Sequence, residues 1–387
     1  MKPRALTAVV AAACLLAPAP AAQAQWERVT SSSSRTTTGQ VAAVRDPTGT
    51  LHVAWRSTTA SYRHRLDHRQ IAPDGTLRPT TTITEDWVEL SDPGITASPE
   101  GLRVLFGGLR SSHPDELNTE LNTALSVDGG AGWTLQDGSI VAPGTGAADA
   151  PVAAVAQADG VPLAAWASPR GTWVHRGVDA AVPASDLQAS LGGTGTRPGV
   201  ASVGARTVVA WYSRSGSARG VYAQEISPGG VPVGTPLPMP GTSGTRMPME
   251  GRTPVAARVG GKVFVAYAAG SGSSRRILLW QVGSSSARTI ARASATSVAT
   301  VATDAAGRVW VAWTSRSRGR DRVRARRSDA KVARFGPTID AGRPSSGAAA
   351  VSLDASAAGE SLDVLAGYRA RGSSRVGTWY SRIAEDD

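Results

Sequence analysis

The sequence predicts an all-β fold, a seven-bladed β-propeller in which each blade contains four antiparallel strands. One combination recurs along the chain: a run of small and β-branched residues, a Gly- or Asp-containing turn, and an alternating apolar run that ends in an aromatic residue. From Trp55 to Tyr368 this aromatic position advances 313 residues over six intervals, about 52 residues per repeat, which is within the range of propeller blades. Gly-rich turns and the lack of a long helical period favour strands over helices.

Residues 1–24 have the pattern of a secretory signal peptide and are excluded from the predicted fold. Lys2 and Arg4 precede an apolar run over 5–16, and Ala22-Gln-Ala24 is a small-x-small cleavage site. We expect cleavage near Ala24 and a secreted or periplasmic location. The apolar run is too short to cross a bilayer, and we expect no membrane-spanning segment elsewhere.

Composition restricts the functions that are expected. Cleavage removes the one cysteine, so the mature chain of 387 − 24 = 363 residues depends on its core rather than on a disulfide. The net charge of +11 falls to +9 when Lys2 and Arg4 leave, and only three of the 41 basic residues are lysine. Basic residues are not interleaved with aromatics as in nucleic-acid modules, so we predict no nucleic-acid partner.

The repeats predict one propeller domain over residues 25–387. Its blades are expected at about 39–85, 92–142, 149–191, 197–240, 252–291, 295–341 and 345–383. The first strand of each unit is nearly all small residues, as expected where strands converge on an axis. The aromatic that ends the second strand is expected farther out, between blades, and stands at Trp55, Phe106, Trp166, Trp211, Tyr267, Trp313 and Tyr368.

Closure of the ring is also predicted. The seventh unit has three strands and lacks a fourth, whereas Trp26-Glu-Arg-Val-Thr30 is a strand without a blade. Pairing these two segments (25–31 with the last unit) would complete the seventh blade and remove an exposed edge. The alternative is an N-terminus without fixed structure.

One motif resembles a known family. Ser126-Val-Asp128-Gly-Gly130-Ala-Gly132-Trp133 is similar to the Asp-box, the Ser-x-Asp-x-Gly-x-Thr-Trp hairpin of sialidase-like (BNR-repeat) propellers, with Gly132 where Thr is usual. Asp128 is expected to accept backbone N–H groups across a turn that Gly130 permits, with Trp133 packed beneath. The motif is structural and indicates an architecture rather than an activity.

The catalytic features that this resemblance implies are not found. Sialidases carry an Arg-Ile-Pro motif, an arginine triad and a Tyr/Glu nucleophile pair. The sequence contains no Arg-Ile-Pro, and no position matches the nucleophile pair. The resemblance to sialidases also implies six blades, whereas the repeats of this sequence predict seven.

A candidate ligand site follows from the register of the repeats. Three residues before the first apolar residue of each inner strand stand Thr38, Asp92, Asp149, Arg197, Arg252, Ala295 and Ser345. In a propeller these positions form a ring at one mouth of the channel, where two acids followed by two arginines would bind a ligand with hydroxyl and anionic groups. The alternative is that Asp149 pairs with Arg197 and only joins two blades.

Three further features have two interpretations each. Trp87, in an acidic connection near this mouth, suits stacking on a sugar ring or packing between blades. His64 and His68 have a spacing that could place both rings on one face, but too few ligands converge to predict a metal. The arginine-rich segment 316–327 suits docking to anionic polymers or a charged edge that resists sheet addition.

The sequence therefore favours an exported, monomeric binding module without a cofactor, whose ligand is a carbohydrate or another polar or anionic envelope component. It also allows a protein partner. The ligand would lie against Asp92, Asp149, Arg197, Arg252 and Trp87. A sialidase-like hydrolase or lyase, with Asp92 or Asp149 as proton donor and the arginines holding a carboxylate, is the first alternative. A scaffold without a small ligand is the second.

Overall fold

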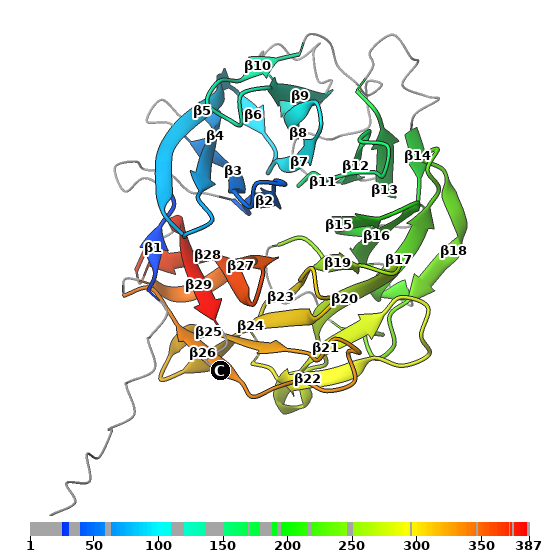
Figure 1. Ribbon diagram of the computed structural model, residues 1–387. Helices are drawn as coiled ribbons and strands as arrows, with labels where there is room; N and C mark the ends of the chain where they lie inside the picture. The colour runs from blue at the N-terminus through cyan, green and yellow to red at the C-terminus, as the bar shows by residue number, and fades with distance from the viewer. Residues whose placement is uncertain are drawn as a thin grey trace, which may run out of the picture.

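The computed structural model describes residues 25–30, 39–58, 63–109, 120–136, 151–168, 171–178, 188–191, 195–214, 218–245, 251–294, 296–345, 347–370, 372–373 and 375–384. Within these residues, seven antiparallel sheets form a ring around a central axis (Figure 1). The prediction of an all-β, seven-bladed propeller is confirmed. The one helical element in the described part is the 3-10 turn η3 (Gly272–Ser274).

Each blade is a meander whose first strand lies nearest the axis. Blade one contains β2 (Ala42–Arg45), β3 (Leu51–Thr58), β4 (His64–Ile71) and β5 (Leu77–Trp87). In blade two the inner strand is split into β6 (Glu89–Leu90) and β7 (Gly94–Ser98), followed by β8 (Gly101–Leu109), β9 (Glu120–Ser126) and β10 (Thr134–Leu135). Blade three contains β11 (Ala153–Ala156), β12 (Pro162–Ser168), β13 (Gly171–Arg176) and β14 (Gln188–Ser190).

The remaining blades repeat this order. Blade four contains β15 (Gly195–Val203), β16 (Arg206–Ser213), β17 (Gly220–Ile226) and β18 (Pro232–Pro238). Blade five contains β19 (Val255–Arg258), β20 (Lys262–Ala269), β21 (Arg276–Gln281) and β22 (Arg288–Arg292). Blade six contains β23 (Ala299–Thr303), β24 (Val309–Ser317), β25 (Arg320–Arg327) and β26 (Ile339–Gly342). Blade seven contains β27 (Gly347–Ala358), β28 (Ser361–Ala370), β29 (Val376–Ala384) and, as its outer strand, β1 (Glu27–Arg28).

The N-terminal strand closes the ring as predicted. Strand β1 pairs antiparallel with β29, with Glu27 opposite Tyr380 and Arg28 opposite Trp379. Beside it, the Trp26 indole N–H donates to the carbonyl oxygen of Ala341 in blade six at 2.7 Å. The two ends of the described chain are therefore joined within one sheet (Figure 1).

The propeller has two faces, which the direction of the strands defines. Inner strands begin, second strands end and each blade connects to the next on one face, which we call the connection face. Turns between first and second strands, and between third and fourth strands, lie on the other, which we call the turn face. Of the predicted mouth residues that the structure describes, Asp92 and Arg252 precede β7 and β19 and Arg197 lies near the start of β15, so these three belong to the connection face.

Crowding at the axis explains the small residues of the inner strands. A Cβ atom added to Gly94 would lie 2.7 Å from the Ala154 Cβ in blade three. A Cβ atom on Gly199 would lie 2.0 Å from the Thr253 carbonyl oxygen at the start of blade five. Real Cβ atoms do not approach other atoms so closely, so the neighbouring inner strands leave no room for a side chain at these points.

Seven aromatic side chains fill the seven interfaces between blades. The described apolar residues form seven clusters, each drawn from two adjacent blades. Each cluster contains one of the aromatics that end the second strands, as predicted: Trp55, Phe106, Trp166, Trp211, Tyr267, Trp313 and Tyr368. All seven are buried, with 7 % exposure or less, so the repeat's most regular feature is also the one that joins the blades.

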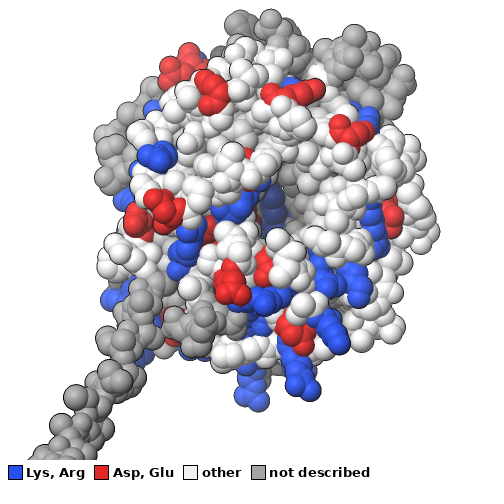
Figure 2. Space-filling model, in the orientation of Figure 1, with Lys and Arg blue, Asp and Glu red and all other residues white. Residues whose placement is uncertain are grey.

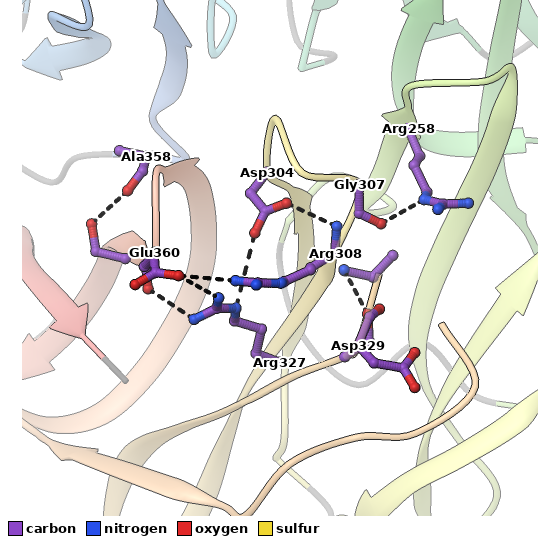
Figure 3. A network of polar contacts seen from close by, with 11 residues as sticks. Arg258, Asp304, Gly307, Arg308, Arg327, Asp329, Ala358 and Glu360 are labelled. Atoms are coloured by element: carbon purple, nitrogen blue, oxygen red, sulfur yellow. Dashed lines mark hydrogen bonds and ion pairs between the residues drawn. The ribbon is translucent and has the colours of Figure 1, made fainter. Parts of the chain in front are cut away.

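Polar contacts on the turn face join blades five, six and seven (Figure 3). The Arg327 guanidinium in blade six lies 3.9 Å from an Asp304 carboxylate oxygen and 3.3 Å from Glu360 in blade seven. Arg308 also reaches Glu360, at 3.2 Å, and Arg258 of blade five donates to the carbonyl oxygen of Gly307. Blades five, six and seven are thus linked on this face by a chain of charged side chains.

The hairpin between β9 and β10 has the hydrogen bonds expected from its sequence. The Ser126 hydroxyl donates to the Asp128 carboxylate at 2.7 Å and accepts from the Gly130 N–H at 2.7 Å. Asp128 also accepts from the Gly132 N–H at 2.9 Å, and these bonds lower the pKa of its carboxyl. Gly130 has a φ of 93°, and Trp133 is half-buried beneath the turn.

A buried carboxylate links the last blade to the first. Asp363 of β28 has no exposed surface and accepts from the Arg382 Nε at 2.7 Å and from the Tyr380 hydroxyl at 2.8 Å, both in β29. It also pairs with Arg45 at the end of β2 in blade one. Blade seven is therefore held to blade one by charge as well as by the pairing of β1.

We expect Asp363→Asn to destabilise the ring by about 3 to 5 kcal/mol, because it leaves two arginines around a neutral partner. Equilibrium denaturation in urea measures this change. The matched control is Asp340→Asn, which removes an exposed Asp–Arg pair in blade six and should cost about 0.5 kcal/mol or less. Equal effects of the two substitutions would contradict this role of Asp363.

Candidate functional site

A cavity of about 180 Å³ lies at the axis, and all seven blades contribute to its wall. Small residues dominate the lining, among them Ala42, Ala153 and Gly199. Its polar groups include Gln40, Arg252, Thr253 and Thr300, together with Asp354. The space-filling view shows a hollow at the axis with basic side chains at its wall (Figure 2).

Arg252 ties four blades together at the connection-face mouth. Its guanidinium donates to the carbonyl oxygens of Val41 in blade one at 2.8 Å, Val152 in blade three at 3.2 Å, and Pro93 in blade two. Its backbone N–H donates to the Gln40 side chain. Three of its five guanidinium N–H groups are therefore bonded to backbone oxygens that precede inner strands.

Burial costs the Arg252 charge much of its hydration, and two acids offset this cost. Desolvation lowers the pKa of Arg252, whereas the charges of Asp354 and Asp92 raise it. Neither acid lies within ion-pair distance, because none of the ion pairs among the described residues includes Arg252. An arginine side chain stays protonated in proteins, so Arg252 gives the mouth a fixed positive charge.

Asp354 carries the one carboxyl group among the residues that line the cavity. It lies on inner strand β27 and accepts a hydrogen bond from the Ala355 N–H at 2.8 Å. Burial raises the pKa of this carboxyl to about 6, against the opposing effects of the Arg252 charge and the Ala355 hydrogen bond. Its proton equilibrium is therefore centred close to neutral pH.

Asp92 lies at the predicted mouth, but its carboxylate contacts other groups of the protein. One oxygen accepts from the Gln40 N–H at 3.0 Å, and the other lies 3.5 Å from the Arg56 Nε. Gly39 makes this approach possible, because a Cβ atom there would lie 1.8 Å from the Asp92 carboxylate. The Asp92 side chain is only 12 % exposed, and its contacts join blades one and two.

Arg197 is placed by its backbone and by its effect on a neighbouring tyrosine. It sits at a β-bulge in β15 with a φ of 57°, and its carbonyl oxygen accepts from the Thr253 N–H at 2.8 Å. Burial raises the pKa of the Tyr267 hydroxyl, and the charges of Arg275 and Arg197 oppose the rise. The Arg197 guanidinium thus acts at the interface of blades four and five. Asp149 lies outside the described residues.

Trp87 packs between blades rather than beside the cavity. It is 2 % exposed, its ring meets Phe106 edge to face at 5.3 Å, and its indole N–H donates to Thr84 at 3.0 Å. Protein therefore covers both faces of the ring, which corresponds to the second interpretation given above. Gly108 leaves the space that Trp87 occupies, because a Cβ atom there would lie 2.7 Å from the indole.

The histidines form a buried pair that the sequence did not predict. The His68 Nε2 lies 3.1 Å from the His52 Nδ1, whose ring in turn contacts Asp46 at 3.1 Å. Burial, reinforced by the neighbouring His52, lowers the pKa of His68 to about 3, so both rings are neutral at physiological pH. His64 is not part of this pair, and in the described part of the chain no three His, Cys, Asp or Glu side chains are grouped to hold a metal.

Two of the residues that shape the cavity escaped the sequence analysis. Apart from Glu89 in β6, Asp354 is the only acid in the seven inner strands, and this exception to the pattern of small residues was a signal that the sequence contained. Gln40 gave no such signal, because its role depends on Arg252, which is 212 residues away. Among the described residues, no helix has the length and apolar character needed to cross a membrane.

Comparisons with known proteins support the fold and leave the function open. No family model and no curated protein matches the chain. Among solved structures, polysaccharide lyase Uly1 is similar with a TM-score of 0.53 and 9 % identity over 90 % of each chain. A Trypanosoma rangeli sialidase mutant that displays trans-sialidase activity gives 0.50 and 13 %, covering 89 % of this chain and 54 % of the other. A puromycin hydrolase gives 0.54 and 12 %, covering 86 % and 50 %, so the chain spans about half the length of the last two.

The raised pKa of Asp354 predicts how stability depends on pH. The folded state binds this proton more tightly than the unfolded state, whose carboxyl titrates near 3.9. Stability linked to Asp354 therefore increases as pH falls from about 6 to about 4, and the ionised group is a cost above that window.

We expect Asp354→Asn to be more stable than the wild type at pH 8, by up to about 3 kcal/mol, and to match it at pH 4. Urea denaturation at the two pH values tests this expectation. Asp86→Asn, at a carboxylate that is 81 % exposed, is the control and should show no difference at either pH. An Asp354→Asn variant less stable at pH 8 than at pH 4, relative to wild type, would contradict the assignment.

Proposed function

We propose that this protein is an exported binding module that accepts one sugar unit of a glycan in the axial cavity. The observation that carries the proposal is the combination of Arg252 and Asp354 in one small cavity. The two side chains bear opposite charges, and neither is neutralised by an ion pair among the described residues. A sugar hydroxyl both donates and accepts hydrogen bonds, so it suits an acid and a guanidinium that face the same space.

The size and donors of the cavity support this ligand class. Its volume of about 180 Å³ is below the several hundred Å³ typical of drug-sized ligands, which favours a single ring or the end of a chain. Arg252 retains two guanidinium N–H groups beyond the three bonded to carbonyl oxygens. The Asp354 carboxylate has bonding capacity beyond the Ala355 N–H.

The sequence supports the cellular location, and the comparisons support the type of ligand. The pattern of residues 1–24 favours export, and the Asp-box-like hairpin at 126–133 favours kinship with sialidase-like propellers. Two of the similar folds are described as a sialidase mutant and a polysaccharide lyase, so this architecture is compatible with carbohydrate ligands.

A carbohydrate-cleaving enzyme is the second candidate, and Asp354 favours it. A pKa of about 6 suits a group that donates or accepts a proton near neutral pH. Glycoside hydrolysis requires a second carboxyl group, and the described lining of the cavity supplies only this one. Asp92, the earlier candidate, is held by Gln40 and Arg56, while Asp149 stays a candidate from the sequence.

We expect the mature protein to bind glycans on an array, and Asp354→Asn to weaken that binding about 10- to 100-fold, as expected for a hydrogen bond to a charged group. Asp340→Asn, at an exposed acid outside the cavity lining, is the matched control and should bind like wild type. A protein that binds no neutral or acidic glycan, or one whose binding is indifferent to Asp354→Asn, would overturn the proposal.

The same variants separate binding from catalysis. Release of a reporter from aryl glycosides by the wild type, abolished in Asp354→Asn, would favour the enzyme. Binding without release supports the binding module.

A further inference from the structure

Six arginines on the connection face over blades five, six and seven stand without acidic partners. We call them the arginine arc: Arg276 and Arg292 in blade five, Arg318 and Arg320 in blade six, and Arg369 and Arg375 in blade seven. All six are exposed, and no ion pair among the described residues includes any of them. Each lies at the end of a second, third or fourth strand, on the face where the axial cavity has its Arg252 mouth.

Acids are missing from this region in the sequence itself. Residues 251–303, which include all of blade five, contain no Asp or Glu, and residues 364–384 contain none either. In blade six, Asp321 is 1 % exposed and accepts from the Ala350 N–H, while Asp340 pairs with Arg322 and Arg324. Within the described residues, no carboxylate therefore pairs with an arginine of the arc.

The turn face of the same blades is built differently. There Arg308 and Arg327 share Glu360 (Figure 3). On the same face, Asp363 binds Arg45 and Arg382. Within the described residues, unpaired basic residues also occur on the turn face, among them Lys262, Lys331 and Arg334. The two faces differ in their acids, because Glu360 and Asp363, which form ion pairs between neighbouring blades, lie on the turn face.

Three arginines of the arc occupy positions that oppose stability. Arg276 and Arg292 are direct cross-strand partners in β21 and β22, and like charges in such a pair repel each other. Arg318 has a φ of 50° in the two-residue turn before β25, where Asn or Gly is preferred. Residues that break local rules without a structural benefit are expected where a protein binds something.

We propose that the arginine arc binds a linear acidic polysaccharide along the outer part of the connection face. Guanidinium groups match the geometry of carboxylates and bind them with paired hydrogen bonds. Arginines at the ends of strands in three consecutive blades present a curved row of such groups, which suits a chain with repeated charges rather than a single small anion. This inference deepens the proposed function, because it names the polymer whose terminal sugar the axial cavity would accept.

The test measures affinity for polygalacturonate over a series of salt concentrations with the full-length mature protein. The arc variant combines Arg276→Gln, Arg292→Gln, Arg318→Asn and Arg320→Gln. The matched control removes the same charge from exposed basic residues of the turn face that have no ion pair in the described structure: Arg78→Gln, Lys262→Gln, Lys331→Gln and Arg334→Gln. Both variants lower the net charge by four.

We expect the arc variant to bind polygalacturonate at least about tenfold more weakly at low salt, with a shallower dependence on salt, because fewer counterions are released on binding. The control variant should change affinity by about twofold or less, since it removes equal charge from a different surface. Equal weakening of both variants would show attraction by net charge alone and would overturn the proposal. Tighter binding of single-stranded DNA of the same charge would overturn the assignment to a polysaccharide.

A second measurement separates binding from stability. The Arg276→Gln/Arg292→Gln pair should unfold at the same or a higher urea concentration than wild type, because the substitutions relieve repulsion, while it binds polygalacturonate more weakly. Loss of stability together with affinity would assign the two arginines a structural role instead.

The two proposals fail in different ways. A wild-type protein that binds neutral oligosaccharides through Asp354 but not polygalacturonate overturns the arc and leaves the cavity proposal intact. Polygalacturonate binding that needs the arc and is indifferent to Asp354→Asn supports the arc and overturns the cavity as the site of the terminal sugar.

Discussion

The convergence of seven inner strands on one axis governs the rest of the molecule. Near the axis the strands lie so close that Gly94 and Gly199 have no room for a Cβ atom. Farther out the blades diverge, and the space between them must be filled with large side chains. Each of the seven interfaces accordingly holds at least one buried aromatic from a second strand, and the ring closes when β1 completes the seventh sheet.

Arg252 is the exception to this size gradient, and its contacts explain why it is tolerated. At the mouth of the channel the backbone carbonyl groups of Val41, Pro93 and Val152 have no strand partner on the axial side. The Arg252 guanidinium donates a hydrogen bond to each of these three carbonyl oxygens. Without it, these carbonyl groups would lack this donor, which is costly for a buried backbone group. The charge that Arg252 brings is then offset at a distance by Asp92 and Asp354.

The features that could be predicted from the sequence are mainly those that recur in every blade. The small residues of the inner strands and the aromatics of the interfaces recur in all seven units, so each copy supports the prediction of the others. The closing strand occurs once and is predicted because the seventh unit lacks a fourth strand. The candidate site differs, because its groups depend on contacts between residues that are far apart in the chain. Nothing near Asp92 in the sequence reveals that Gln40 and Arg56 contact its carboxylate, and nothing near Arg197 reveals the bulge of β15 at which it lies. Asp354 was visible as an anomaly, but its raised pKa arises from burial.

The two faces of the propeller provide an internal comparison for deciding which charges serve the fold. The same strands supply both faces, so the composition and the packing requirements are shared. On the turn face, charged side chains form pairs that join neighbouring blades, as Arg327 and Glu360 do. On the connection face over blade five, Arg276 and Arg292 repel each other and no acid lies in the sequence of that blade. Pairing between blades therefore accounts for Arg327 and Glu360 on the turn face, whereas the fold gives Arg276 and Arg292 no such role, as expected if this surface binds a ligand.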